Sequence, residues 1–336
     1  MAPDKFRGSL SAAEAAAAMA AGVEAAGFEA RRIPLADGGE GTLDALVAAR
    51  GGSVRSTSVT GPLGEPVEAE WALLPDGTGV IEMARASGLS LVRRNDPLRA
   101  STRGTGELIN AVLRAGARHV IVGVGGSATT DGGLAAVEAL GWSLSGHDVT
   151  VACDVSTPFL DAARVYGPQK GASPAQIELL TRRLARLADA YRDRTGVDVT
   201  LLEGGGAAGG LAGGLAAIGT RLEPGFDVVA RAAGLDRALE DADLVVTGEG
   251  RLDRTSFEGK VVGGVLEWAA DEGVDKRVVI AGQATDEGRE ELSVLGAVHL
   301  LTLTERAWQA GEAFSRAALF VEEAALEAAR AASGDA

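Results

Sequence analysis

The sequence predicts an α/β protein with mainly parallel strands, and three observations support that class. Apolar runs of strand length alternate along the chain with alanine-rich runs of helical length, which is the element order of parallel α/β sheets. The 336 residues suit two domains of ordinary size rather than one small domain. Hydrophobic residues make up 46% of the chain, so a large core can be buried.

Capping residues mark the expected helices. Ser11, with Glu14 three residues later, forms a capping box and predicts a helix to about Ala26. Ser173, followed by Pro174 and Gln176, predicts a second helix that reaches about Asp193. Further helices are expected at residues 42–49, 106–115, 131–140 and 312–332.

Short apolar runs predict the strands. Buried strands are expected at residues 31–36, 119–124, 149–154, 197–202, 244–247, 277–281 and 298–303. Alternating residues from Val67 to Leu73, the turn Asp76-Gly77 and the run from Gly79 to Met83 predict an antiparallel hairpin instead. This hairpin indicates an insertion or a domain junction.

Charge and cysteine content exclude several classes of protein. The net charge of −15 and the pI of about 4.8 argue against a nucleic-acid binder and against binding to an anionic membrane. Cys153 is the only cysteine, so an intrachain disulfide is impossible and a reducing compartment is expected. The sequence shows no signal-peptide pattern and no long uninterrupted apolar stretch. We therefore expect a cytoplasmic protein that contacts no membrane and no nucleic acid.

Two acidic glycine loops lie near the start of the chain. Asp4, Lys5 and Arg7 directly precede the Ser11 helix cap, where a helix N-terminus favours anions. The loop Asp37-Gly38-Gly39-Glu40-Gly41-Thr42 places two carboxylates three residues apart at a strand-to-helix turn. Such carboxylates can ligate Mg²⁺ or accept the proton of a substrate hydroxyl.

Two longer glycine loops are suited to phosphates. Residues 123–133 follow an expected strand and enter a helix. Residues 204–214 contain the pattern G-x-G-x-x-G at Gly204, Gly206 and Gly209, and Glu223 lies 19 residues after Gly204. That spacing is typical of dinucleotide-binding proteins, so an NAD-dependent dehydrogenase of a small hydroxy acid is an alternative function. A non-catalytic sensor of sugar acids or nucleotides is a third.

Charged residues also follow two later runs. Glu249, Arg251 and Asp253 leave the end of an expected buried strand together, where ligands bind in α/β sheets. Lysine is rare, and three of the four lysines lie in glycine-bearing loops, where a compact ammonium can meet a phosphate. These three are Lys5, Lys170 and Lys260.

The ordered motifs resemble those of the bacterial type I glycerate kinase family (glycerate 2-kinase). The resemblance runs from Met1 to about Gln283 through A-P-D-K-F-R-G-S-L, A-D-G-G-E-G-T, I-E-M-A-x-A-S-G-L, G-T-G-E-L-I, G-G-S-A-T-T-D-G-G, A-C-D-V, G-P-Q-K-G-A, G-A-A-G-G-L and T-G-E-G-R-L-D. It implies transfer of the γ-phosphoryl group of ATP to D-glycerate, dependence on Mg²⁺, and 2-phosphoglycerate as the product. Whether O2 or O3 of glycerate is phosphorylated stays open.

The resemblance also implies an architecture. Two α/β domains with Rossmann- or flavodoxin-like sheets are expected on either side of a cleft, the second inserted into the first. The expected bounds are 1–60 with 236–336 for the first domain and 61–235 for the second; a homodimer is a further expectation. Family members usually carry a short apolar strand immediately before Ala-Pro-Asp, whereas this sequence begins at Met1-Ala2.

The resulting hypothesis assigns a role to each candidate residue. Lys5 or Lys170 neutralises the transferred phosphoryl group, and Arg251 clamps the glycerate carboxylate. The catalytic candidates are Asp4, Lys5, Asp37, Glu40, Lys170 and Asp253. Arg7, Ser9 and Arg251 are the candidates for binding glycerate. Those for the ATP phosphates are Gly125, Gly126, Ser127, Thr129, Gly206 and Gly209. Asp37, Asp154 and Glu249 are candidates for Mg²⁺ or for the base.

Overall fold

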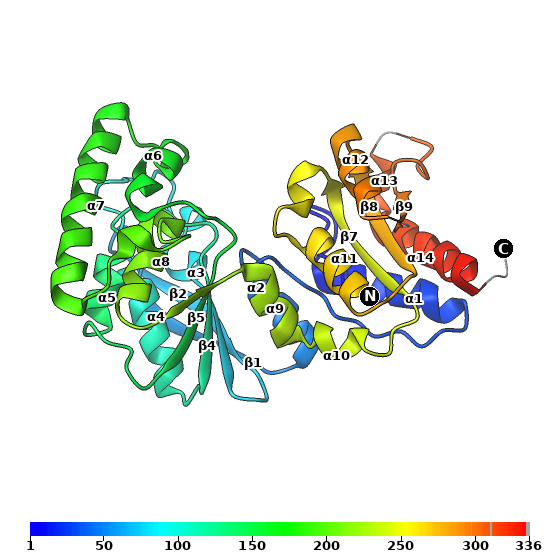
Figure 1. Cartoon of the computed structure of the whole chain (residues 1–336), viewed down its shortest axis with the longest axis horizontal. Helices are drawn as coiled ribbons and strands as arrows, with labels where there is room; N and C mark the ends of the chain where they lie inside the picture. Colours follow the sequence, from blue (N-terminus) through cyan, green and yellow to red (C-terminus); the bar gives the residue numbers. More distant parts are fainter. Residues whose placement is uncertain (297, 310, 334–336) are drawn as a thin grey trace. The chain divides into compact units, whose positions relative to one another are not determined.

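A computed structural model describes residues 1–296, 298–309 and 311–333 of the chain (Figure 1). The chain divides into two compact units. Unit 1 comprises Met1–Asp37, Asp44–Arg50 and Phe226–Ala336, and unit 2 comprises Gly38–Leu43 and Gly51–Gly225. The domain bounds expected from the sequence, at residues 60/61 and 235/236, stay a prediction. Within the described ranges, no helix has the length and hydrophobicity needed to cross a bilayer.

Unit 2 contains a six-stranded sheet in the order β1-β2-β3-β4-β5-β6. Its strands are β1 Ser53–Thr60, β2 Pro66–Leu73, β3 Thr78–Glu82, β4 His119–Gly123, β5 Asp148–Ala152 and β6 Arg221–Glu223. The predicted hairpin is confirmed as the antiparallel pair β2–β3, and β1 extends it. From β3 to β6 the strands are parallel, so the carboxyl ends of β3, β4 and β5 meet at one edge.

The helices of unit 2 connect and cover this sheet. They are α3 Ala84–Ser87, α4 Arg103–Arg114, α5 Leu134–Ala139, α6 Ala162–Tyr166, α7 Pro174–Thr195 and α8 Ala207–Ala217, with short 3₁₀ turns η1 Leu89–Leu91, η2 Phe159–Asp161, η3 Pro168–Lys170 and η4 Val199–Leu201. The predicted capping box at Ser173 and Gln176 is confirmed at the start of α7. The predicted strand at 197–202 is wrong, because the Asp198 carboxylate accepts hydrogen bonds from Thr200 and turns the chain into η4.

Unit 1 contains a parallel three-stranded sheet in the order β7-β8-β9. Its elements are α1 Ala12–Ala25, α2 Thr42–Arg50, α9 Gly225–Ala233, α10 Leu235–Leu239, β7 Val245–Leu252, η5 Arg254–Phe257, α11 Val261–Asp271, β8 Arg277–Ala284, α12 Asp286–Val294, β9 Val298–Thr302, α13 Glu312–Ser315 and α14 Ala317–Ser333. In β8, Val278 and Ile280 pack in the cluster that contains α1 and α14, whereas Val279 and Ala281 pack with α11 and α12. The alternation of side chains along the strand therefore builds three layers.

The first residues of the chain lie beside β7. The backbone N–H groups of Ala2 and Asp4 donate to the carbonyl oxygens of Val246 and Gly248, each at 2.9 Å. On the other side, Ile33 and Leu35 donate to the carbonyl oxygens of Met1 and Pro3. The strand predicted at 31–36 is therefore an extended, hydrogen-bonded segment but not a regular strand. Backbone hydrogen bonds thus hold the Asp4–Arg7 loop at the carboxyl end of β7.

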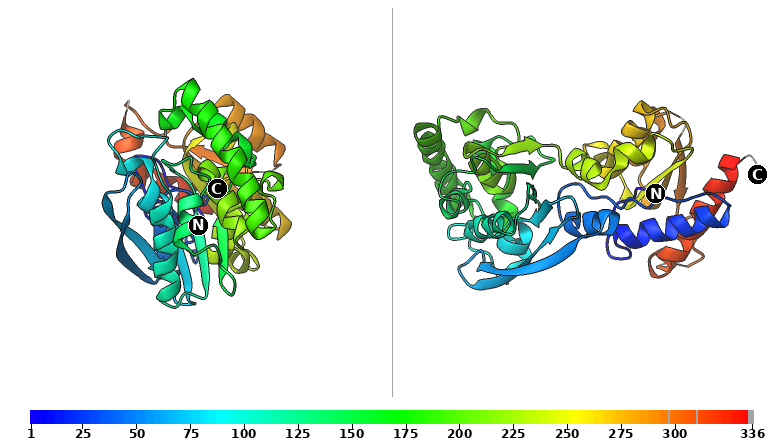
Figure 2. Two further views of the ribbon diagram at one scale, coloured as in Figure 1. Left: turned by 90° about the vertical axis from the view of Figure 1, so that its left-hand side faces the viewer. Right: turned by 90° about the horizontal axis from the view of Figure 1, so that it is seen from below.

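Gly22 allows α1 and α14 to lie side by side (Figures 1 and 2). A Cβ atom at this position would lie 2.2 Å from the carbonyl oxygen of Glu322 and 2.8 Å from the amide nitrogen of Leu326. We expect Gly22→Ala to lower the free energy of unfolding by about 1–3 kcal/mol through overpacking, against a gain of ~1 kcal/mol in helix propensity. Urea denaturation measures the difference.

The exposed Ala17 of α1 provides the control for this variant. Ala17→Gly changes helix propensity alone and should cost about 1 kcal/mol. A Gly22→Ala protein as stable as the wild type would show that the two helices can move apart without a loss of unfolding free energy.

Candidate active site

A cavity of about 580 Å³ lies in unit 1, where the first residues of the chain and the carboxyl ends of β7, β8 and β9 meet. Four of its lining residues are acidic and four are basic. The acids are Asp4, Asp37, Glu249 and Asp253, and the bases are Lys5, Arg7, Arg251 and Lys260. The remaining lining residues are Phe6, Ser9, Gly250, Thr255, Gly282, Gln283, Leu303, Thr304, Gly311, Ala313 and Phe314. Ligands of α/β sheets bind at such an edge.

A tight turn forms the first wall of the cavity. Phe6 and Leu10 exchange backbone hydrogen bonds at 2.9 and 3.0 Å, and the Ser9 hydroxyl donates to the Phe6 carbonyl oxygen. Gly8 adopts a φ of +81°, which favours glycine. The side chain of Phe6 is 1% exposed and anchors the turn in the core of unit 1. Lys5 and Arg7 of the same segment line the cavity.

Asp4 and Asp37 form a pair of neighbouring carboxylates in this cavity. Burial raises the pKa of Asp4 to about 6, and the negative charge of Asp37 acts in the same direction. A backbone hydrogen bond from Lys5, at 2.7 Å, opposes the rise. The two acids come from adjacent extended segments, since Leu35 is hydrogen-bonded to Pro3.

Glu249 is the acid that β7 contributes. Burial raises the pKa of its carboxyl group to about 7, and a hydrogen bond from Ser256 acts in the opposite direction. The Ser256 hydroxyl, 1% exposed, accepts in turn from the Asp253 amide at 3.0 Å. The Oε1 atom of Glu249 is buried and has no hydrogen-bond partner in the described chain. A buried carboxylate oxygen of this kind calls for a donor from a water molecule or a ligand.

The glycines beside Glu249 allow close packing. A Cβ atom at Gly250 would lie 2.9 Å from the amide nitrogen of Arg7, and one at Gly248 would lie 2.0 Å from the Ile280 carbonyl oxygen. These glycines bring the first loop and β8 against the end of β7. The repeated glycines of this motif thus have a packing role in addition to any contact with ligand.

Asp253 starts the 3₁₀ turn η5. Its carboxylate accepts from the Thr255 amide and hydroxyl at 2.9 and 2.7 Å, and the hydroxyl bond lowers its pKa. Lys260 donates to the Thr255 hydroxyl at 2.9 Å, and Arg251 lies 3.7 Å from Asp253. The three charged residues therefore form one hydrogen-bonded and ion-paired group at the cavity wall.

Other candidate residues lie in unit 2. Glu40 is exposed in the loop after Asp37, and Asp154 accepts a hydrogen bond from the Gly225 amide at 2.6 Å. The 38–43 loop is held by Glu82, which the sequence interpretation missed. Glu82 is 3% exposed, and its Oε1 accepts from the amides of Gly41 and Leu43. The one feature of the sequence that could have identified Glu82 was its position in the I-E-M-A motif.

Lys170 is buried in unit 2 and 2% exposed. Its ammonium donates to the Thr129 carbonyl oxygen at 2.5 Å. Burial lowers its pKa to about 8, while the charge of Asp131 opposes that change. In this arrangement Lys170 ties the 167–171 loop to the 123–133 loop.

The two predicted phosphate loops pack against each other. A Cβ atom at Gly209 would lie 2.0 Å from the Thr129 carbonyl oxygen, and the Ser127 hydroxyl donates to the Ala208 carbonyl oxygen at 3.3 Å. A Cβ atom at Gly206 would lie 2.4 Å from the Pro158 carbonyl oxygen. Gly125 and Gly126 also lie close to neighbouring residues. A Cβ atom at Gly125 would lie 2.9 Å from Gly39, and one at Gly126 would lie 3.1 Å from Ala84. The dinucleotide pattern at Gly204, Gly206 and Gly209 follows the 3₁₀ turn η4 and not a strand, so it lacks the preceding strand that its function requires.

The acids of the cavity fit a magnesium ion bound with a nucleotide. No group of three or more His, Cys, Asp or Glu side chains among the described residues is arranged to hold a metal by itself. Mg²⁺ in phosphoryl-transfer sites usually takes only one or two carboxylates, with phosphate oxygens and water as the other ligands. The adjacent carboxylates of Asp4 and Asp37 meet that requirement.

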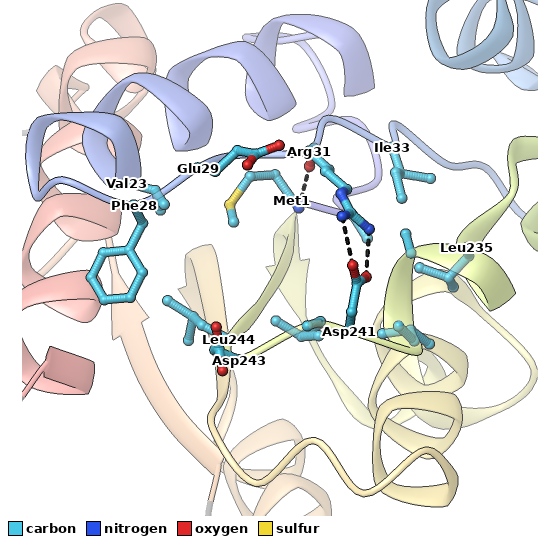
Figure 3. A pocket seen from close by; sticks show the side chains of 15 residues that line it. Met1, Val23, Phe28, Glu29, Arg31, Ile33, Leu235, Asp241, Asp243 and Leu244 are labelled. Atoms are coloured by element: carbon cyan, nitrogen blue, oxygen red, sulfur yellow. Dashed lines mark hydrogen bonds and ion pairs between the residues drawn. The ribbon is translucent and has the colours of Figure 1, made fainter.

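A second cavity of about 270 Å³ also lies in unit 1 (Figure 3). Apolar side chains such as Phe28 and Leu244 line it together with Arg31 and Asp241. Arg31 points toward Asp241 and donates two hydrogen bonds to it, at 2.6 and 2.8 Å. Because one cationic side chain, which is already paired, lies among the described residues that line this cavity and four line the first, this cavity is less suited to an anionic substrate than the first.

Comparisons with known proteins agree on one family. The model of the glycerate kinase family matches residues 1–148 and 143–333. The chain is 42% identical over 327 residues to glycerate 2-kinase of Escherichia coli K12, covering 85% of each chain. It is 39% identical over 368 residues to glycerate kinase of Bacillus subtilis, covering 97% of this chain and 95% of the relative. A crystal structure assigned to glycerate kinase 2 of Salmonella typhimurium LT2 superposes with a TM-score of 0.84 at 38% identity, covering 99% of this chain and 97% of that one.

Proposed function

The chain belongs to the glycerate kinase family, and from this premise we propose that it transfers the γ-phosphoryl group of ATP to a hydroxyl group of D-glycerate, giving 2-phosphoglycerate and ADP. The observation that supports this reaction is the buried, unpartnered carboxylate oxygen of Glu249 in a cavity that also contains four cations. Phosphoryl transfer needs a positioned hydroxyl group and neutralisation of phosphate charge rather than covalent catalysis.

In this proposal Glu249 is the base. Its free Oε1 accepts the hydrogen bond of the glycerate hydroxyl group and then its proton as the bond to phosphorus forms. A pKa of about 7 makes the carboxylate a competent acceptor near neutral pH without leaving it too weak a base. Ser256 holds the carboxylate in place.

The cations divide between the two substrates. Arg251 presents a planar guanidinium at the cavity wall, which suits a bidentate pair with the glycerate carboxylate. Lys5 and Lys260 offer compact ammonium groups for the transferred phosphoryl group and its leaving oxygen. Arg7 lies on the same side as Lys5 and adds positive charge there.

Asp4 and Asp37 would hold Mg²⁺. When bound, the ion neutralises the phosphate oxygens of the nucleotide. Asp253, which caps η5 and pairs with Arg251, orients the arginine in this scheme. The roles predicted for Glu40 and Lys170 in catalysis, for Asp154 in metal binding and for the glycine loops of unit 2 in phosphate binding stay predictions. We also propose the cytoplasm as the compartment, where ATP is present and a lone cysteine stays reduced; a homodimer stays a prediction.

A direct assay tests the reaction. The protein is mixed with D-glycerate and either MgATP or NAD, and ADP, phosphoglycerate and reduced nicotinamide are measured. We expect ADP and phosphoglycerate to appear together, with ³¹P NMR showing the phosphate on O2. Reduced nicotinamide without ADP would overturn the proposal in favour of a dehydrogenase, and a phosphate on O3 would overturn the product assignment alone.

A further inference from the structure

The cavity of unit 1 has more room than glycerate requires. Its volume of about 580 Å³ lies in the range of ~300–1,000 Å³ that ordinarily holds a drug-sized ligand. Glycerate is a three-carbon acid and fills only a small part of such a space. A second and larger molecule therefore fits in the same cavity. Its chemistry should match the lining residues that carry no charge.

The lining residues from the far side of the sheet carry no charge. Gly282 and Gln283 come from β8, Leu303 and Thr304 follow β9, and Gly311, Ala313 and Phe314 come from the segment before α14. The acids and cations come instead from the first loop, from Asp37, and from the end of β7 and the turn after it.

Sheet order separates the strands that contribute these two groups. The segment that contains Asp4 pairs with β7, β7 pairs with β8, and β8 pairs with β9. Neighbouring strands lie about 4.8 Å apart, so three intervals span on the order of 14 Å. A nucleoside triphosphate has a comparable length, so the row of strand ends is long enough to hold one.

Phe314 offers an aromatic surface where the uncharged wall of the cavity meets the first loop. The residue is 57% exposed although it lines the cavity. One edge of its ring contacts Gly8, where a Cβ atom would lie 3.1 Å from the ring. The ring is thus supported by the first loop while much of its surface remains open. Aromatic side chains of this kind stack on nucleobases with little dependence on base identity.

We propose that the uncharged wall of the cavity is the nucleobase subsite of the phosphoryl donor, with Phe314 as the stacking surface. The amide of Gln283 can donate to and accept from the edge of the base. The inference rests on the proposed kinase reaction, and it assigns the base of the nucleotide to unit 1, beside the charged groups that receive its terminal phosphate.

The test is the effect of Phe314 variants on each substrate separately. Phe314→Ala should raise the KM for ATP by about 10–100-fold and leave the KM for glycerate within about 2-fold of wild type. Phe314→Trp keeps a stacking surface and should retain the wild-type KM for ATP. Trp308→Ala removes an aromatic residue that is 94% exposed and not a lining residue, and it should change neither value.

Binding measurements separate the base from the phosphates. Calorimetry should show that Phe314→Ala raises the Kd for ADP by the same factor by which it raises the KM for ATP. Inorganic tripolyphosphate should bind the wild type and the variant with equal affinity. Equal ADP affinity in the two proteins, or a parallel loss of tripolyphosphate binding, would overturn the subsite. A wild-type protein that binds ADP in this way but does not phosphorylate glycerate would overturn the proposed reaction and leave the subsite standing.

Discussion

Replacing Glu249 with glutamine is expected to lower kcat for glycerate phosphorylation by about 10²–10⁴-fold, the usual effect of losing a general base. The change preserves the shape of the side chain and its contact with Ser256 while removing the proton acceptor. The KM for ATP should change little, because Glu249 contacts the hydroxyl group of glycerate in the proposed mechanism. Steady-state kinetics on the purified proteins measure both quantities.

Glu258→Gln provides the matched control. Glu258 lies nine positions further along the chain, is exposed, and pairs with Arg254 at 3.1 Å. Its replacement removes one negative charge from the same region and should leave kcat within about 2-fold of wild type. A Glu249→Gln protein with near-normal turnover and normal folding would remove Glu249 from the chemistry.

The pH profile gives an independent reading of the same residue. With a pKa of about 7, wild-type Glu249 is protonated at lower pH, so kcat/KM should fall as the pH decreases below about 7. The residual activity of Glu249→Gln should lack this acid limb. An acid limb that persists unchanged in the variant would assign it to another group, with Asp4 at about 6 as the next candidate.

Stability should respond to pH in the opposite direction. The pKa of Glu249 is raised in the folded protein from an ordinary value of 4.5 to about 7. Its contribution to stability is therefore fully present below about pH 4.5 and is lost as the pH rises through about 7. Glu249→Gln does not titrate, so between low pH and about pH 8 it should gain on the order of 3 kcal/mol of unfolding free energy relative to wild type. Urea denaturation of both proteins across this range provides the comparison.

Replacing Asp37 with asparagine should lower kcat by at least about 100-fold at saturating substrates and raise the Mg²⁺ concentration needed for half-maximal rate. Asp37 shares the cavity with Asp4 and raises its pKa. Loss of the Asp37 charge should also lower the pKa of Asp4 toward its ordinary value. An Mg²⁺ titration of the initial rate separates an effect on metal binding from an effect on the chemistry.

Asp271→Asn serves as the control for Asp37→Asn. Asp271 is an exposed acid at the end of α11 and does not line the cavity. Its replacement should alter neither kcat nor the Mg²⁺ requirement. If Asp37→Asn turned over normally with an unchanged Mg²⁺ requirement, Asp37 would be neither ligand nor base, and Asp4 alone would remain for the metal.

Local sequence patterns predicted most of the regular elements. The capping boxes at Ser11 and Ser173 start helices where expected, because a capping box satisfies helix N–H groups within four residues. The hairpin around Asp76-Gly77 is equally local. The strand predicted at 197–202 was wrong. Its apolar pattern does not indicate whether a partner strand is present, and Asp198 turns the chain into η4 instead.

The composition of the cavity was partly predictable. Asp37, Glu249 and Arg251 were candidates from the sequence because each follows an apolar run, and parallel packing brings the ends of such runs to one edge. Asp4 was a candidate because it precedes the Ser11 helix cap. Phe314 and Gln283 were missed, since a lone phenylalanine or glutamine has no pattern that distinguishes a cavity wall from a surface. Lys170 had the glycine neighbours of a phosphate-binding lysine, yet its ammonium lies against the Thr129 carbonyl oxygen.

What the sequence by itself determined was the α/β class, the family, and the loops in which charge and glycine occur together, because each depends on the order of residues along the chain. Only the tertiary structure decided which loops share a cavity and which glycines pack against backbone. The carboxyl group of Glu249 shows the physical reason. Its pKa and its unpartnered oxygen arise from burial beside Ser256 and Asp4, and Asp4 comes from the other end of the sequence and is brought to β7 by backbone hydrogen bonds.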